Sequence, residues 1–183
     1  MESVPERAVG PDRHLEALTV LETARLRLRK MTPDDAPFIL ELLNDPDFLA
    51  YIGDRNVRSL DDARNYLLNG PIDSYARYGH GLYLVESIED GVPAGMCGLL
   101  FREAWQETDI GYAFLPRFRG RGFAFEAGSA VLDYGRRVLG KSRIIAIVSP
   151  GNAASIAVLE KLGLRYEKRA RMNAEADEVL VYA

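Results

Sequence analysis

Short apolar stretches with two different periods alternate along this chain. Strict alternation of basic and apolar residues at Arg25-Leu26-Arg27-Leu28-Arg29 predicts a strand with one buried face. Other runs of apolar and β-branched residues, bounded by turn residues, also predict strands. The expected strands cover residues 25–29, 81–86, 93–101, 107–115 and 143–148, followed by a closing antiparallel pair at 164–171 and 178–182.

Helical periodicity fills the intervals between these strands. Thr32-Pro33-Asp34-Asp35 starts a helix with a cap residue, a proline in the first turn and two acids. Ser59-Leu60-Asp61-Asp62 resembles a capping box at the start of a second helix. We expect Asn44-Asp45-Pro46-Asp47 to break the first helix and Gly70-Pro71 to end the second. Later helices are expected from Phe123 to Leu139 and from the Asn152 cap to Gly163.

The order of these elements, β-α-α-β-β-β-α-β-α-β-β, predicts an α/β (α+β) fold with one mixed sheet and helices on both of its faces. The chain has 183 residues, of which 48% are hydrophobic, and this is enough for one domain with a substantial core. Residues 1–17 are polar and include two prolines. We therefore expect a poorly ordered N-terminal extension before a single domain at residues 18–183.

Composition and charge exclude several classes of function. The net charge of −4 and the isoelectric point near 5.3 do not suit a nucleic-acid-binding protein. Cys97 stands alone, and His14 and His80 are far apart, so we expect neither an internal disulfide nor a metal site. No apolar run reaches the roughly 18 residues of a membrane span, and the N-terminus lacks the apolar core of a signal peptide. We expect a cytoplasmic protein, either a monomer or a homodimer, without membrane or nucleic-acid partners.

The most informative chemical signal lies between the fourth expected strand and the third expected helix. The connecting segment, Arg119-Gly120-Arg121-Gly122-Phe123-Ala124, is rich in glycine and arginine. At a helix N-terminus the backbone N–H groups point outward, the helix dipole is positive, and glycine lets a phosphate approach closely. Arg117, Arg119 and Arg121 add charged donors. The segment indicates a site for a phosphorylated ligand such as the pyrophosphate of a coenzyme, and an ordinary tight turn with solvated arginines is the alternative.

A second segment competes for such a ligand. Gly135-Arg136-Arg137-Val138-Leu139-Gly140-Lys141-Ser142 matches the phosphate-binding pattern G-x-x-x-x-G-K-[ST]. That pattern requires a strand before it and a helix after it, whereas here a helix enters and a strand leaves. We interpret the segment as a helix C-terminus, with Gly140 in the left-handed conformation and Lys141 beside the negative end of the dipole.

Another helix start follows the next strand. Asn152-Ala153-Ala154-Ser155 leads into Leu159-Glu160-Lys161-Leu162-Gly163-Leu164. With the 119–124 loop and the opening Leu21-Glu22-Thr23-Ala24-Arg25-Leu26-Arg27-Leu28-Arg29, these segments resemble the GNAT superfamily of acyl-CoA-dependent N-acyltransferases, and more narrowly its RimJ/RimL-type branch. The resemblance runs from Leu21 to the C-terminus. It implies a single mixed, mostly antiparallel sheet whose central strands splay apart.

The resemblance implies that acetyl-CoA lies where the strands at 107–115 and 143–149 separate. Its pantetheine arm would pair with the backbone at the end of the first strand, and its pyrophosphate would bind the N–H groups of the 119–124 loop. The Phe114 N–H is the implied donor to the oxyanion of the reaction. The implied coenzyme-binding residues are Ala113, Phe114, Leu115, Arg119, Gly120, Arg121, Gly122, Phe123, Ala124, Asn152 and Ser155.

The catalytic residues implied by the resemblance depart in part from the family pattern. Many members place a tyrosine, as the acid for the leaving thiolate, where this chain has Leu159. RimL-like members place a serine near the thiol, and Ser155 matches that position. Some members keep a glutamate where this chain has Ala146. The candidate bases are therefore Glu107 and Asp109, which lie two residues apart and so on one face of a strand, unless both are only surface charges.

The implied acceptor is a primary amine, either a protein N-terminal α-amine, such as that of a ribosomal protein, or the amine of a small molecule. The loops at 51–58 and 75–81 would shape its cleft, with Tyr51, Tyr75, Tyr78 and His80 as candidate lining residues. A non-catalytic acyl-CoA-binding module is an alternative, because a fold does not fix a function. Such a module would bind coenzyme A without turnover of any amine.

Overall fold

The computed structural model describes residues 18–171 and 176–183, so the extension expected at residues 1–17 lies outside the described residues. The strands form two antiparallel groups, one in the order β1-β2-β3-β4-β5 and the other in the order β6-β8-β7. Their bounds are β1 (Thr19–Glu22), β2 (Leu26–Arg29), β3 (Leu82–Ser87), β4 (Val92–Arg102), β5 (Glu107–Phe114), β6 (Ala146–Val148), β7 (Tyr166–Arg171) and β8 (Glu178–Tyr182).

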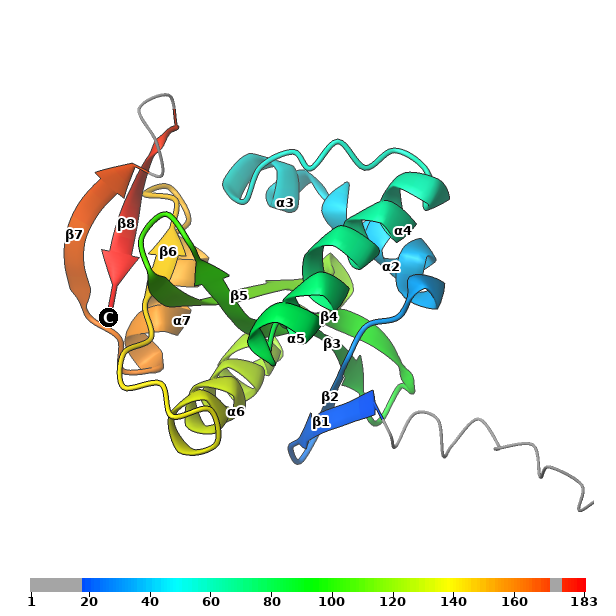
Figure 1. Ribbon diagram of the computed structural model, residues 1–183, viewed down its shortest axis with the longest axis horizontal. Helices are drawn as coiled ribbons and strands as arrows, with labels where there is room; N and C mark the ends of the chain where they lie inside the picture. The colour runs from blue at the N-terminus through cyan, green and yellow to red at the C-terminus, as the bar shows by residue number, and fades with distance from the viewer. Residues whose placement is uncertain (1–17, 172–175) are drawn as a thin grey trace, which may run out of the picture.

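The two groups meet at a parallel bridge between Asp109 of β5 and Ile145, just before β6. The Ile110 N–H donates to Ile145 O at 2.8 Å, and the Ile145 N–H donates to Thr108 O at 2.8 Å. Within the described residues no further pairing joins β5 to β6, so the two strands diverge and leave one edge of β5 unpaired (Figure 1). The predicted mixed, mostly antiparallel sheet is confirmed.

Helices lie on both faces of this sheet. Figure 1 shows α2, α4 and α5 above one face, with α6 beneath the other and α7 beside β6. None of the helices in the described part of the chain is long and apolar enough to cross a membrane. Their bounds are α2 (Ala36–Leu43), α3 (Pro46–Tyr51), α4 (Leu60–Leu67), α5 (Asp73–Tyr78), α6 (Phe123–Arg137) and α7 (Ala153–Lys161), with short 3-10 turns η1 (Pro33–Asp35) and η3 (Pro116–Phe118) and a π-helical turn η2 (Leu68–Ile72).

Two expected breaks behave differently in the structure. The segment after α2 stops that helix, but Asp45 then caps α3 by accepting a bond from the Phe48 N–H at 3.2 Å. The prediction that Gly70-Pro71 ends the second helix is wrong. The chain passes through η2 into α5, because a wide π-helical turn tolerates a proline that has no N–H to donate. The helical run ends at Gly79, which has a φ of +74°.

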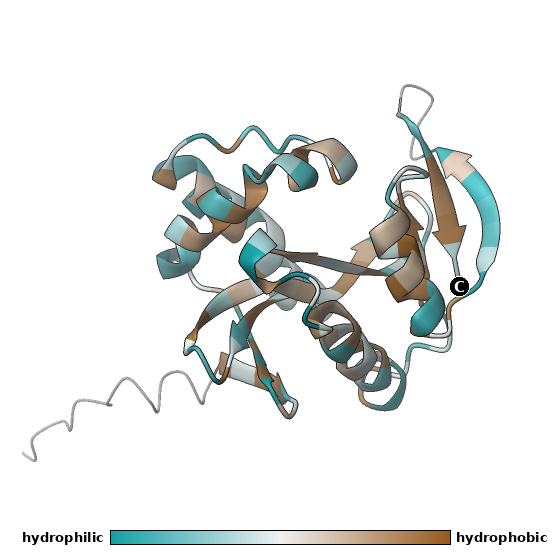
Figure 2. Ribbon diagram, turned by 180° about the vertical axis from the view of Figure 1, so that it is seen from behind, coloured by the Kyte–Doolittle hydropathy of each residue, from teal (hydrophilic) through white to brown (hydrophobic). Residues whose placement is uncertain are grey.

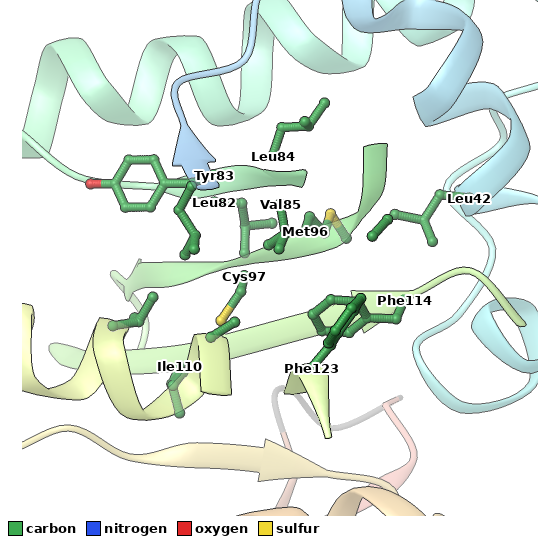
Figure 3. Close-up of a cluster of buried hydrophobic side chains, with 14 of the residues drawn as sticks. Leu42, Leu82, Tyr83, Leu84, Val85, Met96, Cys97, Ile110, Phe114 and Phe123 are labelled. Atoms are coloured by element: carbon green, nitrogen blue, oxygen red, sulfur yellow. The ribbon is translucent and has the colours of Figure 1, made fainter. Parts of the chain in front are cut away.

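The core lies between the five-stranded group and the helices on its two faces. Leu84, Cys97, Ile110, Phe114 and Phe123 are among its buried side chains, from β3, β4, β5 and α6 (Figure 3). Burial raises the pKa of the Cys97 thiol, so this residue is an inert part of the packing. On the smaller group, the hydrophobic strand β8 lies between β6 and the largely hydrophilic edge strand β7 (Figure 2). Charged side chains on such an edge discourage pairing with other chains.

Candidate active site

Two clefts lie where β5 and β6 diverge. The glycine-loop cleft, about 490 Å³ in volume, lies between the end of β5, the start of α6 and α7. The Asp109 cleft, about 310 Å³, lies on the other side of the divergence, toward α4 and β4. The two clefts are adjacent and share a wall, because Phe48, Tyr51, Ile52, Tyr112, Asn152 and Ser155 line both. Two ligands bound in them would meet at this shared wall.

Most of the expected coenzyme-binding residues gather around the glycine-loop cleft. Ala113, Phe114, Arg119, Gly120, Gly122, Phe123, Ala124, Asn152 and Ser155 line it. Leu115 is buried behind the strand end, and its N–H donates to Ala94 O at 3.0 Å. Arg121 stands beside the loop and outside the lining. All of the expected coenzyme-binding residues except Leu115 and Arg121 therefore line one cleft.

The loop before α6 has the backbone shape of an anion site. Gly120 and Gly122 have φ values of +72° and +80°, which residues with a Cβ rarely adopt. Gly122 is the N-cap of α6, and no side chain caps the helix there. By contrast, Asp45, Ser59 and Asn152 cap the N-termini of α3, α4 and α7. The first-turn N–H groups of α6 are therefore left for a ligand in the glycine-loop cleft.

The arginines near this loop form ion pairs with the protein itself. Arg119 bonds the carboxylates of Asp45 and Asp47, and its Nε donates to Phe114 O at 2.8 Å. Arg117 pairs with Glu41. Arg121 makes longer contacts to two acids, the nearer to Asp90 at 3.4 Å. These arginines fix the loop against α3 and the end of β5, which leaves the backbone as the main source of donors.

The free edge of β5 supplies further donors. The N–H of Ile110 points toward β6, whereas the N–H of Leu115 points toward β4. Backbone groups alternate in direction along a strand, so the N–H groups of Tyr112 and Phe114 point to the same side as that of Ile110. No strand pairs with β5 there in the residues described. An extended ligand in the cleft can therefore pair with this edge.

The first turn of α7 carries a hydroxyl pair at the shared wall. The Asn152 side chain caps α7 by accepting the Ser155 N–H at 3.1 Å. Ser155 Oγ lies 3.0 Å from the hydroxyl oxygen of Tyr112, which also donates to Ser155 O at 3.1 Å. Burial raises the pKa of Tyr112 to about 12, so this phenol stays protonated. No sequence pattern predicts this contact, because it joins residues 43 positions apart on β5 and α7.

Asp109 lies at the base of the second cleft and is only 2% exposed. Its Oδ2 accepts bonds from Arg102 Nε at 2.8 Å and Nη2 at 2.6 Å. Its Oδ1 is buried and has no hydrogen-bond partner among the described residues. Burial raises the pKa of Asp109 to about 6, against the opposing effects of Arg102 and the Ile147 N–H. A carboxyl group with this pKa exchanges a proton near neutral pH.

The other predicted acid and the predicted acceptor aromatics lie elsewhere. Glu107 accepts a bond from Arg143 Nε at 3.0 Å and lines neither cleft. Tyr51 lines both clefts, but Tyr75, Tyr78 and His80 line neither. Those three form the packing under α5, where Tyr75 stacks on Tyr83 and Tyr78 contacts Phe101. None of the three therefore faces either cleft, because their rings pack toward β3 and β4. Arg55, Tyr66 and Arg102 line the Asp109 cleft instead, and no local pattern in the sequence distinguishes them.

The competing phosphate motif is a helix end, as interpreted from the sequence. Gly140 has a φ of +65°, and the Lys141 N–H donates to Gly135 O at 2.9 Å. The segment closes α6 at the end opposite the glycine loop. None of its residues lines either cleft.

Comparisons with known proteins match this geometry. The acetyltransferase (GNAT) domain family matches residues 25–165. The Bacillus subtilis protein YkkB is 36% identical over 160 residues, which cover 86% of this chain and 91% of YkkB. The crystal structure of an acetyltransferase from Agrobacterium tumefaciens aligns with a TM-score of 0.74 at 25% identity, over 100% of this chain and 98% of that one.

Two further solved structures, both from Vibrio cholerae, share the fold at lower identity. One is named as a ribosomal-protein-serine acetyltransferase and has a TM-score of 0.71 at 20% identity, over 88% of this chain and 94% of its own. The other, a variant of the spermidine N-acetyltransferase SpeG, has a TM-score of 0.68 at 20% identity, over 87% and 93%. Their names give two different kinds of amine acceptor for the same fold.

Proposed function

Because the chain belongs to the GNAT family of acetyltransferases, and is thus an N-acetyltransferase, we propose that it moves the acetyl group of acetyl-CoA to a primary amine. The amine attacks directly in a ternary complex. In this proposal the coenzyme occupies the glycine-loop cleft and the amine occupies the Asp109 cleft. The enzyme acts in the cytoplasm, as a monomer or a homodimer.

The uncapped N-terminus of α6 carries the coenzyme assignment. Two glycines of positive φ, Gly120 and Gly122, lead into this N-terminus. Its first-turn N–H groups lie beside a cleft of about 490 Å³. These features fit a pyrophosphate, since an anion supplies the acceptors that a side-chain cap supplies elsewhere. The pantetheine arm then follows the free edge of β5 toward the wall shared with the Asp109 cleft.

The attack takes place at this shared wall, with the Phe114 N–H in the glycine-loop cleft and Asp109 in the other. The amine nitrogen forms a bond to the thioester carbon, and the proton that the nitrogen loses passes through water to Asp109, which lies five residues before Phe114 on β5. The N–H of Phe114 donates to the oxyanion, which is the type of contact that contributes most to such reactions. An α-amine, with a pKa of about 7.7–8.0, is partly neutral at pH 7 and needs only modest help from the carboxylate. Glu107 is the second carboxylate of the strand and is kept as the competing base.

Departure of the thiolate completes the reaction. The bond between the carbonyl carbon and sulfur breaks, and the thiolate accepts a proton. We propose that the Ser155 hydroxyl hydrogen-bonds this sulfur and relays a proton from solvent to it, so that the serine ends the step protonated, because Ser155 lines both clefts and stands one helical turn before Leu159. Tyr112 holds that hydroxyl in place at 3.0 Å and is a positioning residue.

The acceptor of the proposed reaction is an α-amine of a protein or the amine of a small molecule. The RimJ/RimL-like signature of the chain and its likeness to a structure named for a ribosomal-protein substrate support the first class. The volume of the Asp109 cleft, about 310 Å³, is in the range of small-ligand pockets and supports the second. The charges of that cleft, considered below, favour the small molecule.

Calorimetric titration with acetyl-CoA, with Mg-ATP as the control, tests the coenzyme assignment. We expect binding of acetyl-CoA and none of Mg-ATP. Release of free coenzyme A with an amine then separates an enzyme from a module that only binds acyl-CoA. Folded protein that binds no acetyl-CoA would overturn the proposal.

A further inference from the structure

The Asp109 cleft contains more positive than negative charge. Its charged lining consists of Arg55, Arg102 and Asp109, which gives two positive charges against one negative. When Asp109 accepts a proton from the amine in the proposed reaction, both positive charges remain without a counter-charge. A cleft of this kind favours an acceptor that brings its own anionic group.

Arg55 is the residue with the most freedom to bind such a group. It is exposed at the cleft rim and has no hydrogen-bond or ion-pair partner in residues 18–171 and 176–183. The loop that carries it is nevertheless held in place. Asp54 accepts the Asn56 N–H at 2.8 Å and pairs with Arg58, which also donates to Asn44. The loop backbone is therefore held in place by its own bonds, and the Arg55 guanidinium takes part in none of them.

Arg102 stands across the cleft from this loop and is only partly used. Its Nε and Nη2 both donate to Asp109 Oδ2, while Nη1 makes no hydrogen bond within the described residues. Both guanidinium groups act on the hydroxyl of Tyr66, since the positive charges of Arg55 and Arg102 oppose the rise that burial causes in its pKa. Three donors from three separate elements thus line the same cleft.

We propose that the acceptor is a small primary amine that also carries a carboxylate or phosphate group, as a free amino acid does, and that Arg55, Arg102 and Tyr66 bind this anion. This inference rests on the proposed acetyl transfer. The amine lies against Asp109, and the anion lies a few ångströms away against the guanidinium groups. The apolar remainder of the acceptor packs against Phe48, Met96 and Leu100, which also line the cleft.

The alternatives fit these charges less well. A polyamine such as spermidine would bring several positive charges to two guanidinium groups. A protein N-terminus has its amine next to a neutral peptide group, so it offers no anion at this distance. Guanidinium groups hold carboxylates and phosphates through paired, charge-assisted bonds, which favours an anionic amine over both.

Matched amines test the inference on the full chain. Release of coenzyme A is measured with leucine, leucinamide and isoamylamine, which share a side chain but differ in charge beside the amine. Phosphoethanolamine against ethanolamine tests a phosphate in the same way, and spermidine and a peptide with a free N-terminus represent the other classes. We expect kcat/KM for the anionic amine to exceed that of its neutral partner by about 10- to 100-fold.

Variants of Arg55 tie the preference to the cleft. We expect Arg55→Ala to raise KM for the anionic amine about tenfold or more, to leave kcat and acetyl-CoA affinity nearly unchanged, and to leave neutral amines unaffected. Arg55→Glu should reverse the preference toward amines with an additional positive charge. Arg64→Ala is the matched control, because Arg64 is an exposed arginine on α4 that lines neither cleft.

The possible outcomes separate the two levels of the argument. Turnover of spermidine or the peptide in preference to anionic amines, with no response to Arg55→Glu, would overturn the inference and leave the acetyl transfer standing. Turnover of no amine, despite acetyl-CoA binding, would overturn the proposed function and the inference together. An anionic preference that is lost in Arg55→Ala and retained in Arg64→Ala supports both.

Discussion

The two clefts at the divergence of β5 and β6 are built in different ways. One continuous stretch, residues 112–125, supplies the largest share of the glycine-loop cleft, opposite α3 and α7, and its donors are backbone N–H groups. The Asp109 cleft is assembled from side chains on α4, β4, β5, β6 and the loop before α4. A site built from backbone N–H groups tolerates few substitutions of its glycines, but it tolerates many substitutions of side chains that make no contact with the ligand. A side-chain site can be altered residue by residue, which suits a cleft that selects among amines.

The arginines of the two clefts also differ in how they are paired. Arg117 and Arg119 beside the glycine loop are neutralised by acids of α2 and α3 or of the segment between them. In the Asp109 cleft, one carboxylate is shared with one guanidinium, and Arg55 has no partner among the residues described. Lys161 also lines the glycine-loop cleft, over the Phe125 ring, so each cleft keeps one cation without an acidic partner among the described residues, and the first cleft adds the backbone donors of α6.

The largest expected effect comes from Gly122→Glu. The variant places a carboxylate beside the uncapped N–H groups of α6 and strains a residue whose φ is +80°. We expect calorimetry to detect no acetyl-CoA binding by this variant, because the new carboxylate repels the pyrophosphate and competes for the anion site. Gly140→Glu is the matched control, since Gly140 also has a positive φ and open space around it, and it lies at the opposite end of α6. Normal binding by Gly122→Glu would mean that the pyrophosphate lies elsewhere.

Asp109→Asn tests the chemistry of the second cleft. We expect kcat to fall about 10²- to 10⁴-fold, because the amide cannot accept the amine proton. The acidic limb of the kcat/KM profile, with a midpoint near the Asp109 pKa of about 6, should disappear. Glu107→Gln sharpens the assignment of the base: a larger loss in that variant, with the acidic limb intact in Asp109→Asn, would transfer the role to Glu107.

Asp109→Asn lowers activity in the prediction above, but it is expected to raise the stability of the fold near neutral pH. The folded-state pKa of Asp109, about 6, lies above its ordinary value of 3.8, so the folded state binds the proton more tightly. The stability that this provides is present below pH 3.8 and is lost as the pH rises through about 6. We expect urea unfolding to show this loss in the wild type between pH 4 and pH 7, and to show a smaller loss in Asp109→Asn. Equal slopes in the two proteins would contradict the raised pKa.

Ser155→Ala and Tyr112→Phe probe the wall that the clefts share. We expect each to lower kcat about tenfold with little change in acetyl-CoA affinity, because the hydroxyls act on the leaving thiolate. Since Tyr112 acts through Ser155, the double variant should lose no more than Ser155→Ala alone. Additive losses measured by steady-state kinetics would show that the two hydroxyls act separately.

The smallest expected effect lies outside both clefts, at His80. Its Nδ1 contacts Leu99 O at 2.9 Å, and its Nε2 is buried without a partner in the described residues. Burial lowers the pKa of His80, so the unfolded chain binds the proton more tightly and stability falls as the pH drops below about 6.5. We expect His80→Gln to reduce this acid-side loss in urea unfolding while activity at pH 7.5 stays unchanged. A change in activity would connect His80 to the site.

Much of the coenzyme side could be predicted because its signals are local. The glycines at 120 and 122, the helix that follows and the Asn152 cap are read from neighbouring residues, and all three are present in the structure. The helix end at Gly140 was predicted for the same reason. The error at Gly70-Pro71 was also local, since a π-helical turn accommodates a proline that an α-helix would exclude.

The acceptor side could not be predicted in this way. Arg55, Tyr66 and Arg102 come from three elements, and nothing in their sequence neighbourhoods distinguishes them from surface residues. The Tyr112–Ser155 contact joins residues 43 positions apart. Tyr75 and Tyr78 were plausible cleft residues from sequence, but the direction of α5 places their rings against the sheet.

The sequence by itself predicted most of the strands, the glycine loop and the helix that begins after it, because these depend on backbone conformation over a few residues; β1, α3 and α5 were not among the expected elements. Only the tertiary structure decided which charges are neutralised and which are left free. Burial of Asp109, its bond to Arg102 and the isolation of Arg55 depend on distances between separate elements. Electrostatic interactions act through space, so a chain's order of residues does not reveal them until the fold brings the groups together.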